Sequence, residues 1–231
     1  MRLSRDGTFC FMAPPEYFAL TMKTTKETII KVSLQLFAER GFDAVSTSMI
    51  ANRLGITKGA LYRHFESKQA IFDAIWKCML ELDAERAAED SVPEKNYSED
   101  AESYRSVNGH NLCEFVNNQF DFWTENEFAC NFRRMITLEQ FKTPEMTKLY
   151  QDVICAGPVQ YTKDIFTELG KQGKLNQAAL DMEPEILAMQ LFAPLALVIQ
   201  LYDGGMSSIV LKEHLGKITK DFEERWMSDD Q

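Results

Sequence analysis

Cysteine and histidine are scarce in this sequence, and their spacing excludes the commonest metal and redox motifs. Its five cysteines are never closer than 17 residues, so there is no C-x-x-C pair. Its three histidines, His64, His110 and His214, lack the i, i+4 spacing of a helical zinc site. We therefore expect reduced, partly buried thiols, no structural metal and no cofactor.

Long apolar segments are also missing. The longest uninterrupted run covers the nine residues 191–199 and contains Pro194, whereas a membrane-spanning helix needs about 20 apolar residues. Residues 1–21 include an early Asp6 and the pair Pro14-Pro15, so they do not resemble a secretory signal. These features predict a cytoplasmic protein without membrane contact. We expect residues 1–21 to be a flexible extension or a mis-annotated start before Met22.

Strand patterns are absent as well, because no long stretch alternates apolar with polar residues. Helical periodicity and capping residues occur throughout the chain instead. They predict an all-α fold, with a long polar loop over 89–109. The predicted helices cover 24–40, 47–54, 57–65, a segment that begins after Ser67, 111–125, 127–141, 144–172 with a kink or break at Gly157-Pro158, 184–203 and 207–227.

Positive charge is in deficit overall, yet it is concentrated near the amino end. The net charge is −10, which opposes binding to a polyanion such as DNA. Residues 22–68, however, carry eight Lys and Arg against four Asp and Glu, while residues 69–231 carry 15 against 29. This asymmetry predicts a small nucleic-acid-binding domain over 22–68 and a larger acidic domain over 69–231.

The most informative stretch runs from Ser46 to Lys68. Small residues at Ala51 and Gly55 suit a helix-turn-helix, in which two helices pack closely and glycine takes positive φ in the turn. The second helix of the pair begins near Thr57 and contains small residues through which its backbone can approach a major groove. The segment after Phe37, AERGFDAVSTSMIANRLGITKGALYRHFESKQAIF, resembles the signature of TetR-family regulators.

The resemblance covers residues 24–70 and implies a homodimer whose paired recognition helices enter successive major grooves of a palindromic operator in double-stranded DNA. It implies phosphate contacts for Thr47 and Lys68, and contacts to phosphate or a thymine methyl for Tyr62 and His64. Arg63 is the candidate for bidentate reading of a guanine. The predicted DNA-contacting residues are Thr47, Thr57, Lys58, Gly59, Tyr62, Arg63, His64 and Lys68.

The resemblance also implies that each larger domain binds an unidentified small-molecule effector. Ten aromatic residues between positions 115 and 166 form either core or an apolar pocket. Arg133 could meet an anionic ligand, although a solvated or salt-bridged arginine is the simpler reading. The candidate pocket residues are Phe115, Trp123, Arg133, Met135, Tyr161, Met189 and Phe192.

The last two predicted helices are candidates for a dimer interface, since two such helices from each subunit could form a four-helix bundle. The alternative interpretation of their periodicity is that these helices pack within the core of one chain. The candidate interface residues are Leu187, Leu191, Leu195, Val198, Ile218 and Phe222.

The expected function is that of a ligand-responsive transcription regulator, a repressor released from its operator by a small molecule. An enzyme is disfavoured because the sequence has no G-x-S-x-G, G-x-x-x-x-G-K, H-E-x-x-H or dinucleotide-binding motif. The alternative is a DNA-binding adaptor or activator that works without a ligand.

Overall fold

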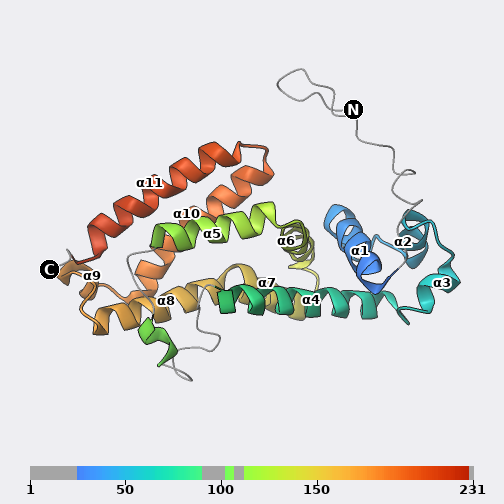
Figure 1. The fold of residues 1–231 in the computed structure, drawn as a ribbon, viewed down its shortest axis with the longest axis horizontal. Coiled ribbons are helices and arrows are strands. Elements are labelled where there is room, and N and C mark those ends of the chain that lie inside the picture. Colours follow the sequence, from blue (N-terminus) through green and yellow to red (C-terminus); the bar gives the residue numbers. More distant parts are fainter. Residues whose placement is uncertain (1–24, 90–101, 107–111, 229–231) are drawn as a thin grey trace, which may run out of the picture. The chain divides into compact units, whose positions relative to one another are not determined.

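The computed structural model describes residues 25–89, 102–106 and 112–228. Within these ranges there is no strand, only an isolated antiparallel bridge between Leu175 and Met227, and the predicted all-α fold is confirmed. The chain divides into two compact units, residues 1–77 and 78–231 (Figure 1). The extension expected over 1–21 and most of the predicted loop lie outside the described residues.

The smaller unit contains α1 (Lys26–Arg40), α2 (Thr47–Arg53), α3 (Lys58–Tyr62) and the first part of α4 (Lys68–Glu89). Its helices begin at side-chain caps, as the sequence predicts. The hydroxyl of Ser46 accepts a hydrogen bond from the Met49 N–H, and that of Ser67 accepts one from the Ala70 N–H.

Glycine with positive φ follows the first two helices. Gly41 has φ 80° after α1, and Gly55 has φ 66° between α2 and α3. Both values lie in the region that glycine adopts without the steric cost of a Cβ atom. The turn of the helix-turn-helix is therefore formed as its glycine predicts.

A small aromatic and aliphatic core holds these short helices together. Ile50 of α2 and Leu61 of α3 are almost completely buried. The Phe42 ring lies 5.1 Å from the Phe37 ring and 5.4 Å from the Phe72 ring, between centroids, so it joins the loop after α1 to α4. Helices as short as α2 and α3 are marginal in isolation and depend on such packing.

The larger unit contains the end of α4 and the remaining helices. The sequence missed two short elements, η2 and α9, because each is about one turn long and has no period to detect. The bounds of these elements are η2 (Ser103–Ser106), α5 (Leu112–Glu125), α6 (Glu127–Glu139), α7 (Pro144–Ile154), α8 (Ala156–Lys171), α9 (Gln177–Leu180), α10 (Pro184–Asp203) and α11 (Ser208–Trp226).

The long helix expected over 144–172 breaks at Cys155, where ψ is −83°. A Cβ atom at Gly157 would lie 1.8 Å from the carbonyl oxygen of Asp152, so only glycine permits this close approach of α8 to the end of α7. Pro158 follows and has no N–H to donate to the preceding turn. The break therefore lies just before Gly157-Pro158, and these two residues suit the close turn between α7 and α8.

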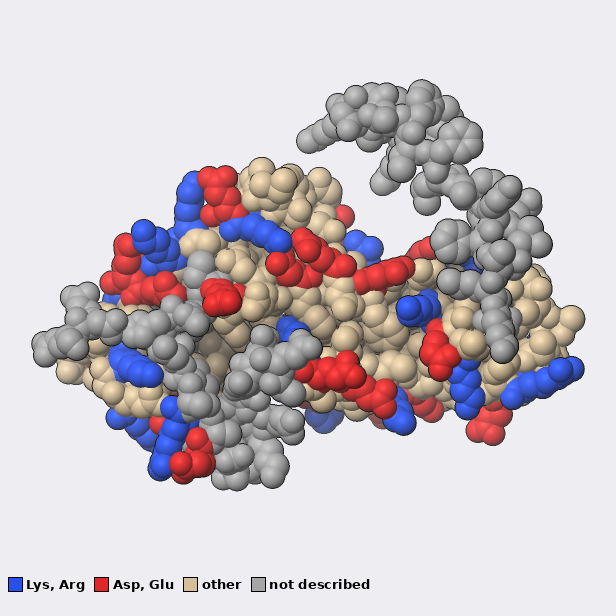
Figure 2. All heavy atoms as spheres, in the orientation of Figure 1, with Lys and Arg blue, Asp and Glu red and all other residues tan. Residues whose placement is uncertain are grey.

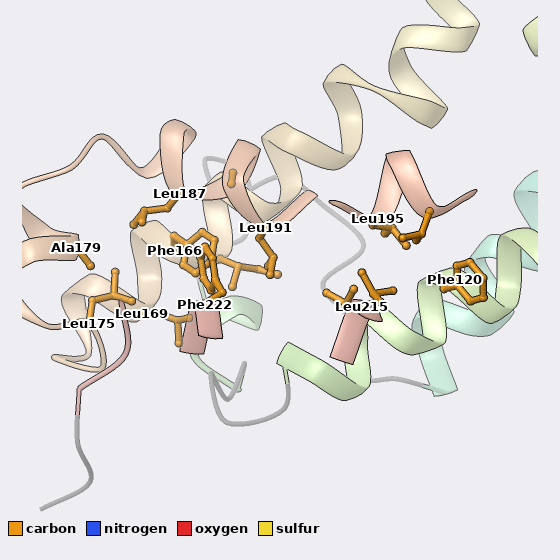
Figure 3. Packing of buried hydrophobic residues seen from close by; sticks show 14 of the residues in the cluster. Phe120, Phe166, Leu169, Leu175, Ala179, Leu187, Leu191, Leu195, Leu215 and Phe222 are labelled. Carbon is orange, nitrogen blue, oxygen red and sulfur yellow. The ribbon is translucent and has the colours of Figure 1, made fainter. Parts of the chain in front are cut away.

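Helices α10 and α11 form an antiparallel pair, and α10 also packs on α8 and α5 (Figure 1). Figure 3 shows Leu187 and Leu191 of α10 beside Phe166 and Phe222, and Leu195 above Leu215 in the same buried cluster. Among the described residues, α10 alone is long and apolar enough to span a membrane, with a mean hydropathy of 1.6. The face of α10 that carries these leucines packs in the core of the unit, as in a core helix of a folded domain.

Candidate functional site

Helix α3 presents a short face of polar and small residues. Lys58, Gly59, Tyr62 and Arg63 are exposed, whereas Leu61 between them is buried and anchors the helix. A Cβ atom built on Gly59 would come no closer than 4.0 Å to any neighbouring side chain, so the fold itself leaves room for a larger residue there. Figure 2 shows a basic side chain protruding at the end of the smaller unit where Figure 1 places α3.

Tyr62 connects the two helices of the motif. Its hydroxyl lies 3.4 Å from the hydroxyl of Thr47 in the first turn of α2. The ammonium group of Lys58 lies 5.8 Å from the centre of the Tyr62 ring, within the range of a cation–π contact. The structure thus gathers two hydroxyls and one ammonium into a polar group that can bind a phosphate.

Two other predicted residues flank this group. Thr57 caps α3, since its hydroxyl accepts a hydrogen bond of 3.1 Å from the Ala60 N–H. His64 is half-buried just after α3. Thr57 therefore has a structural task that is independent of any ligand.

Lys68 differs from the other predicted DNA-contacting residues. Its ammonium group donates to the carbonyl oxygens of Phe42, at 2.7 Å, and Val45, at 2.9 Å. It also lies 4.1 Å from the centre of the Phe42 ring. The sequence offered no sign of these contacts, because they join positions 23 and 26 residues apart.

The predicted pocket residues differ in burial and in the side chains that they contact. The Phe115 and Tyr161 rings lie 6.3 Å apart, and the Tyr161 ring lies 6.2 Å from that of Tyr104 in η2, a residue that sequence reasoning missed. Met135 is completely buried, and Met189 is half exposed on α10. Trp123 and Phe192 are partly buried and pack against the core.

Arg133 is engaged by an acidic residue of its own chain. Its guanidinium donates two hydrogen bonds to the Asp203 carboxylate, at 2.5 and 3.0 Å, and a weaker one to the Trp123 carbonyl, at 3.4 Å. Arg134 donates to the same carboxylate at 2.9 Å. Arg133 is therefore salt-bridged within its own chain, which was the simpler of the two interpretations that the sequence allowed.

Burial acts to raise the pKa of the Asp203 carboxyl, but hydrogen bonds from Arg133 and then from Arg134 outweigh it. The pKa of Asp203 therefore lies below its usual value. Because α6 carries both arginines and Asp203 ends α10, this ion-pair group fixes α6 to the last turn of α10.

The candidate interface residues are mostly interior. Of the six, Ile218 alone is exposed, whereas the other five lie in the core of their own chain. A groove of about 500 Å³ runs between these two helices. It is lined by Gln190, Ala193, Pro194, Leu197, Val198, Ile218, Asp221, Phe222, Arg225 and Trp226.

The helix-turn-helix is similar to those of known proteins. Residues 29–75 match the family model described as bacterial regulatory proteins, tetR family. The chain is 52% identical over 50 residues to the uncharacterized HTH-type transcriptional regulator YerO of Bacillus subtilis, covering 22% of this chain and 17% of that protein. It is 32% identical over 93 residues to the class C tetracycline repressor of Escherichia coli, covering 40% and 38%. These matches span well under half of either relative.

Structural similarity extends over both units. SmeT is the repressor of the Stenotrophomonas maltophilia multidrug efflux pump SmeDEF. The structure of its complex with triclosan is similar to this chain with a TM-score of 0.61, and the similarity covers 90% of this chain and 93% of that one. The sequence identity of 20% makes this a similarity of fold. The larger unit is therefore included in this similarity of fold.

Proposed function

We propose that this chain, which belongs to the TetR family through its N-terminal helix-turn-helix, is a transcriptional repressor that binds a palindromic operator as a homodimer and releases it when an effector binds. The observation that carries the proposal is the exposed face of α3, where Lys58, Tyr62 and Arg63 surround the unobstructed Gly59. The protein would act in the cytoplasm, where bacterial DNA is found. Catalysis has no part in this proposal.

Selection from a pool of random duplexes tests DNA recognition. The wild-type protein should enrich a palindrome whose half-sites lie about one helical turn, 10 base pairs, apart or further. Arg63→Ala should lose about 1–3 kcal/mol of affinity for the selected duplex and should relax the base preference at one position of each half-site. Fluorescence anisotropy on the selected and single-substituted duplexes measures both effects.

Lys58→Ala is the matched control, because Lys58 is also exposed and carries the same charge at the first residue of α3, whereas Arg63 is the C-cap of that helix. It should weaken selected and random duplexes by similar factors, since a phosphate contact carries no sequence information. Failure of the wild-type protein to enrich any sequence would refute the proposed function.

We propose that the second subunit occupies the groove between α10 and α11. Apolar side chains surround the groove on an exposed surface, with Leu197 57% and Ile218 44% exposed. Neighbouring Ile186 and Leu201 extend the same kind of surface along α10. A contiguous exposed apolar surface is unfavourable in water, and a second copy of the α10–α11 pair would cover it in a four-helix bundle. The Discussion gives the decisive substitution.

We propose an apolar aromatic effector for the larger unit. The Tyr161 ring contacts the rings of Tyr104 and Phe115 in two tilted pairs, and these three side chains come from three different elements, η2, α5 and α8. Aromatic and apolar side chains line most small-molecule sites. The structural neighbours include one complex with triclosan and one with choline, so these two compounds are suitable first probes.

Thermal unfolding tests the effector. Triclosan should raise the unfolding temperature, because a ligand at 100 times its Kd stabilises the folded protein by about 2.7 kcal/mol. Tyr161→Leu should remove the shift, whereas Tyr150→Leu, on α7 outside this group of three rings, should retain it. If neither triclosan, choline nor an aromatic compound library stabilises the protein, the ligand-independent adaptor is the better description.

A further inference from the structure

The groove between α10 and α11 contains a single pair of opposite charges. Of the ten residues that line it, Asp221 and Arg225 alone are charged, and both belong to α11. The Arg225 guanidinium donates to the Asp221 carboxylate at 3.2 Å, and the two side chains are 61% and 69% exposed. A pair that is so exposed contributes little to the stability of one chain. Its place in the groove therefore calls for a reason other than the folding of a single subunit.

The net charge of the larger domain opposes self-association. Residues 69–231 carry 15 Lys and Arg against 29 Asp and Glu, so two copies of the domain repel each other at long range. The groove differs from the rest of this domain, because its one carboxylate and one guanidinium balance. A two-fold axis brings the same surface of two subunits together, so the acid and base of one copy can face the base and acid of the other. The groove is therefore electrostatically complementary to a second copy of itself.

The polar groups of the groove have the capacity for further partners. Within the described part of the chain, Arg225 reaches Asp221 through one of its five N–H groups, and a carboxylate accepts more than one hydrogen bond. On α10, the other wall of the groove, Pro194 has no N–H, so the backbone carbonyl of Gln190 lacks its usual helical donor. A covering subunit would remove water from these groups, which then need polar or charged partners. A second chain with the same charged pair can supply them.

The end of α11 that carries the charged pair is held by the turn before α9. The Asn176 side-chain amide donates to the Arg225 carbonyl at 2.8 Å, and the Asn176 N–H donates to the Trp226 carbonyl at 3.1 Å. The Ser228 N–H donates to the Lys174 carbonyl at 2.9 Å. The last carbonyls of a helix otherwise lack partners in the helix, and chain ends are usually poorly ordered. Because this end is already fixed, a partner that binds to it pays a smaller ordering cost.

We infer that Asp221 and Arg225 select a second copy of this chain as the partner, with Arg225 of each subunit paired to Asp221 of the other. The inference rests on the proposed homodimer and goes beyond it, because it names the side chains that decide which chains pair. The apolar residues of the groove supply the buried area, whereas the two charges reject a chain that presents a like charge. A charged pair that served its own subunit alone would leave the choice of partner unaffected.

Reversal of one charge at a time tests this selection. Asp221→Arg gives a chain with two cations in the groove, and Arg225→Glu gives a chain with two anions. Each variant alone should form a homodimer with a Kd about tenfold above that of the wild type, because like charges then meet. The two variants are then mixed, one of them isotopically labelled, until subunit exchange is complete. Native mass spectrometry should find heterodimers far in excess of the proportion that random exchange produces.

Glu213 and Lys217 provide the matched control. They form the same i, i+4 pair on α11, with side chains 62% and 70% exposed, and neither lines the groove. Glu213→Arg and Lys217→Glu therefore remove the same kind of pair within the chain and leave the charges of the groove unchanged. Each control variant should dimerise like the wild type, and their mixture should show random exchange.

Asp221→Asn and Arg225→Gln extend the test if a charge reversal prevents folding. Their heterodimer retains one ion pair between the subunits, whereas each homodimer retains none, so mixing should again favour the heterodimer, though less strongly. Random exchange in these mixtures, with a wild type that is dimeric, would overturn the inference and leave the proposed homodimer intact. A wild type that light scattering finds to be a single subunit would refute the proposed homodimer, and the inference with it.

Discussion

Leu197→Glu should convert the protein from a species of twice the 26.5 kDa chain mass into one of 26.5 kDa. Leu197 lines the groove between α10 and α11 and is 57% exposed, so its side chain contributes little to the core of its own subunit. In a two-fold bundle the same position occurs on both subunits, and the substitution buries two unpaired carboxylates in an apolar interface. Light scattering coupled to size exclusion measures the mass.

The same variant should bind the selected palindrome about 100-fold more weakly, because separated subunits lose the effective concentration that links the two half-sites. Leu138→Glu on α6 is the control, since Leu138 is similarly exposed but does not line the groove. It should remain dimeric and bind normally. A Leu197→Glu protein that stays dimeric would place the interface elsewhere.

Asp203→Asn should lower the free energy of unfolding by about 3 kcal/mol, because it leaves the buried guanidinium of Arg133 without its carboxylate. The Arg133 side chain is 7% exposed, and the neutral amide cannot replace a bidentate charged acceptor. Urea unfolding at fixed protein concentration measures the change. A loss below about 0.5 kcal/mol would show that the ion-pair group is as weak as a surface pair.

Asp152→Asn provides the matched control. Asp152 pairs with Lys148 one turn along α7, outside the groove, and both side chains are more than half exposed. An exposed pair of this kind contributes roughly 0.3–0.5 kcal/mol. The control therefore separates the effect of a buried guanidinium from the general effect of removing an acidic side chain.

The contribution of Asp203 to the free energy of unfolding should also depend on pH. The lowered pKa of Asp203 sets the direction of that dependence. A carboxyl whose pKa is lower in the folded protein stabilises the fold above its unfolded value of about 3.9. That stabilisation is lost as the pH falls through the lowered folded pKa. The difference in free energy of unfolding between the wild type and Asp203→Asn should stay constant from about pH 7 to 5 and shrink below about pH 4.

Local sequence signals predicted most of the helix boundaries. Ser46, Thr57 and Ser67 act as the caps that their positions suggested, and Gly55 takes the positive φ that the turn needs. These signals work because a cap or a turn involves residues within one helical turn of each other. The helix-turn-helix could therefore be located, together with its exposed α3, from a short segment.

Sequence periodicity could not decide which surface is buried within the chain. Leu187, Leu191 and Leu195 form the regular apolar stripe of α10, and the structure places this stripe in the core of its own subunit (Figure 3). Leu197 and Leu201 lie on another side of the same helix and remain exposed. Because α10 is apolar on most of its circumference, its sequence does not distinguish the face that packs internally from the face left for a partner.

The amino-acid sequence by itself determined the all-α class, the helix-turn-helix and the basic character of residues 22–68, since each follows from composition or from residues close together in the chain. The tertiary structure alone decided that Lys68 meets the carbonyls of Phe42 and Val45 and that Arg133 meets Asp203. A long charged side chain selects its partner by distance in space, and helix packing sets that distance between positions far apart in the chain.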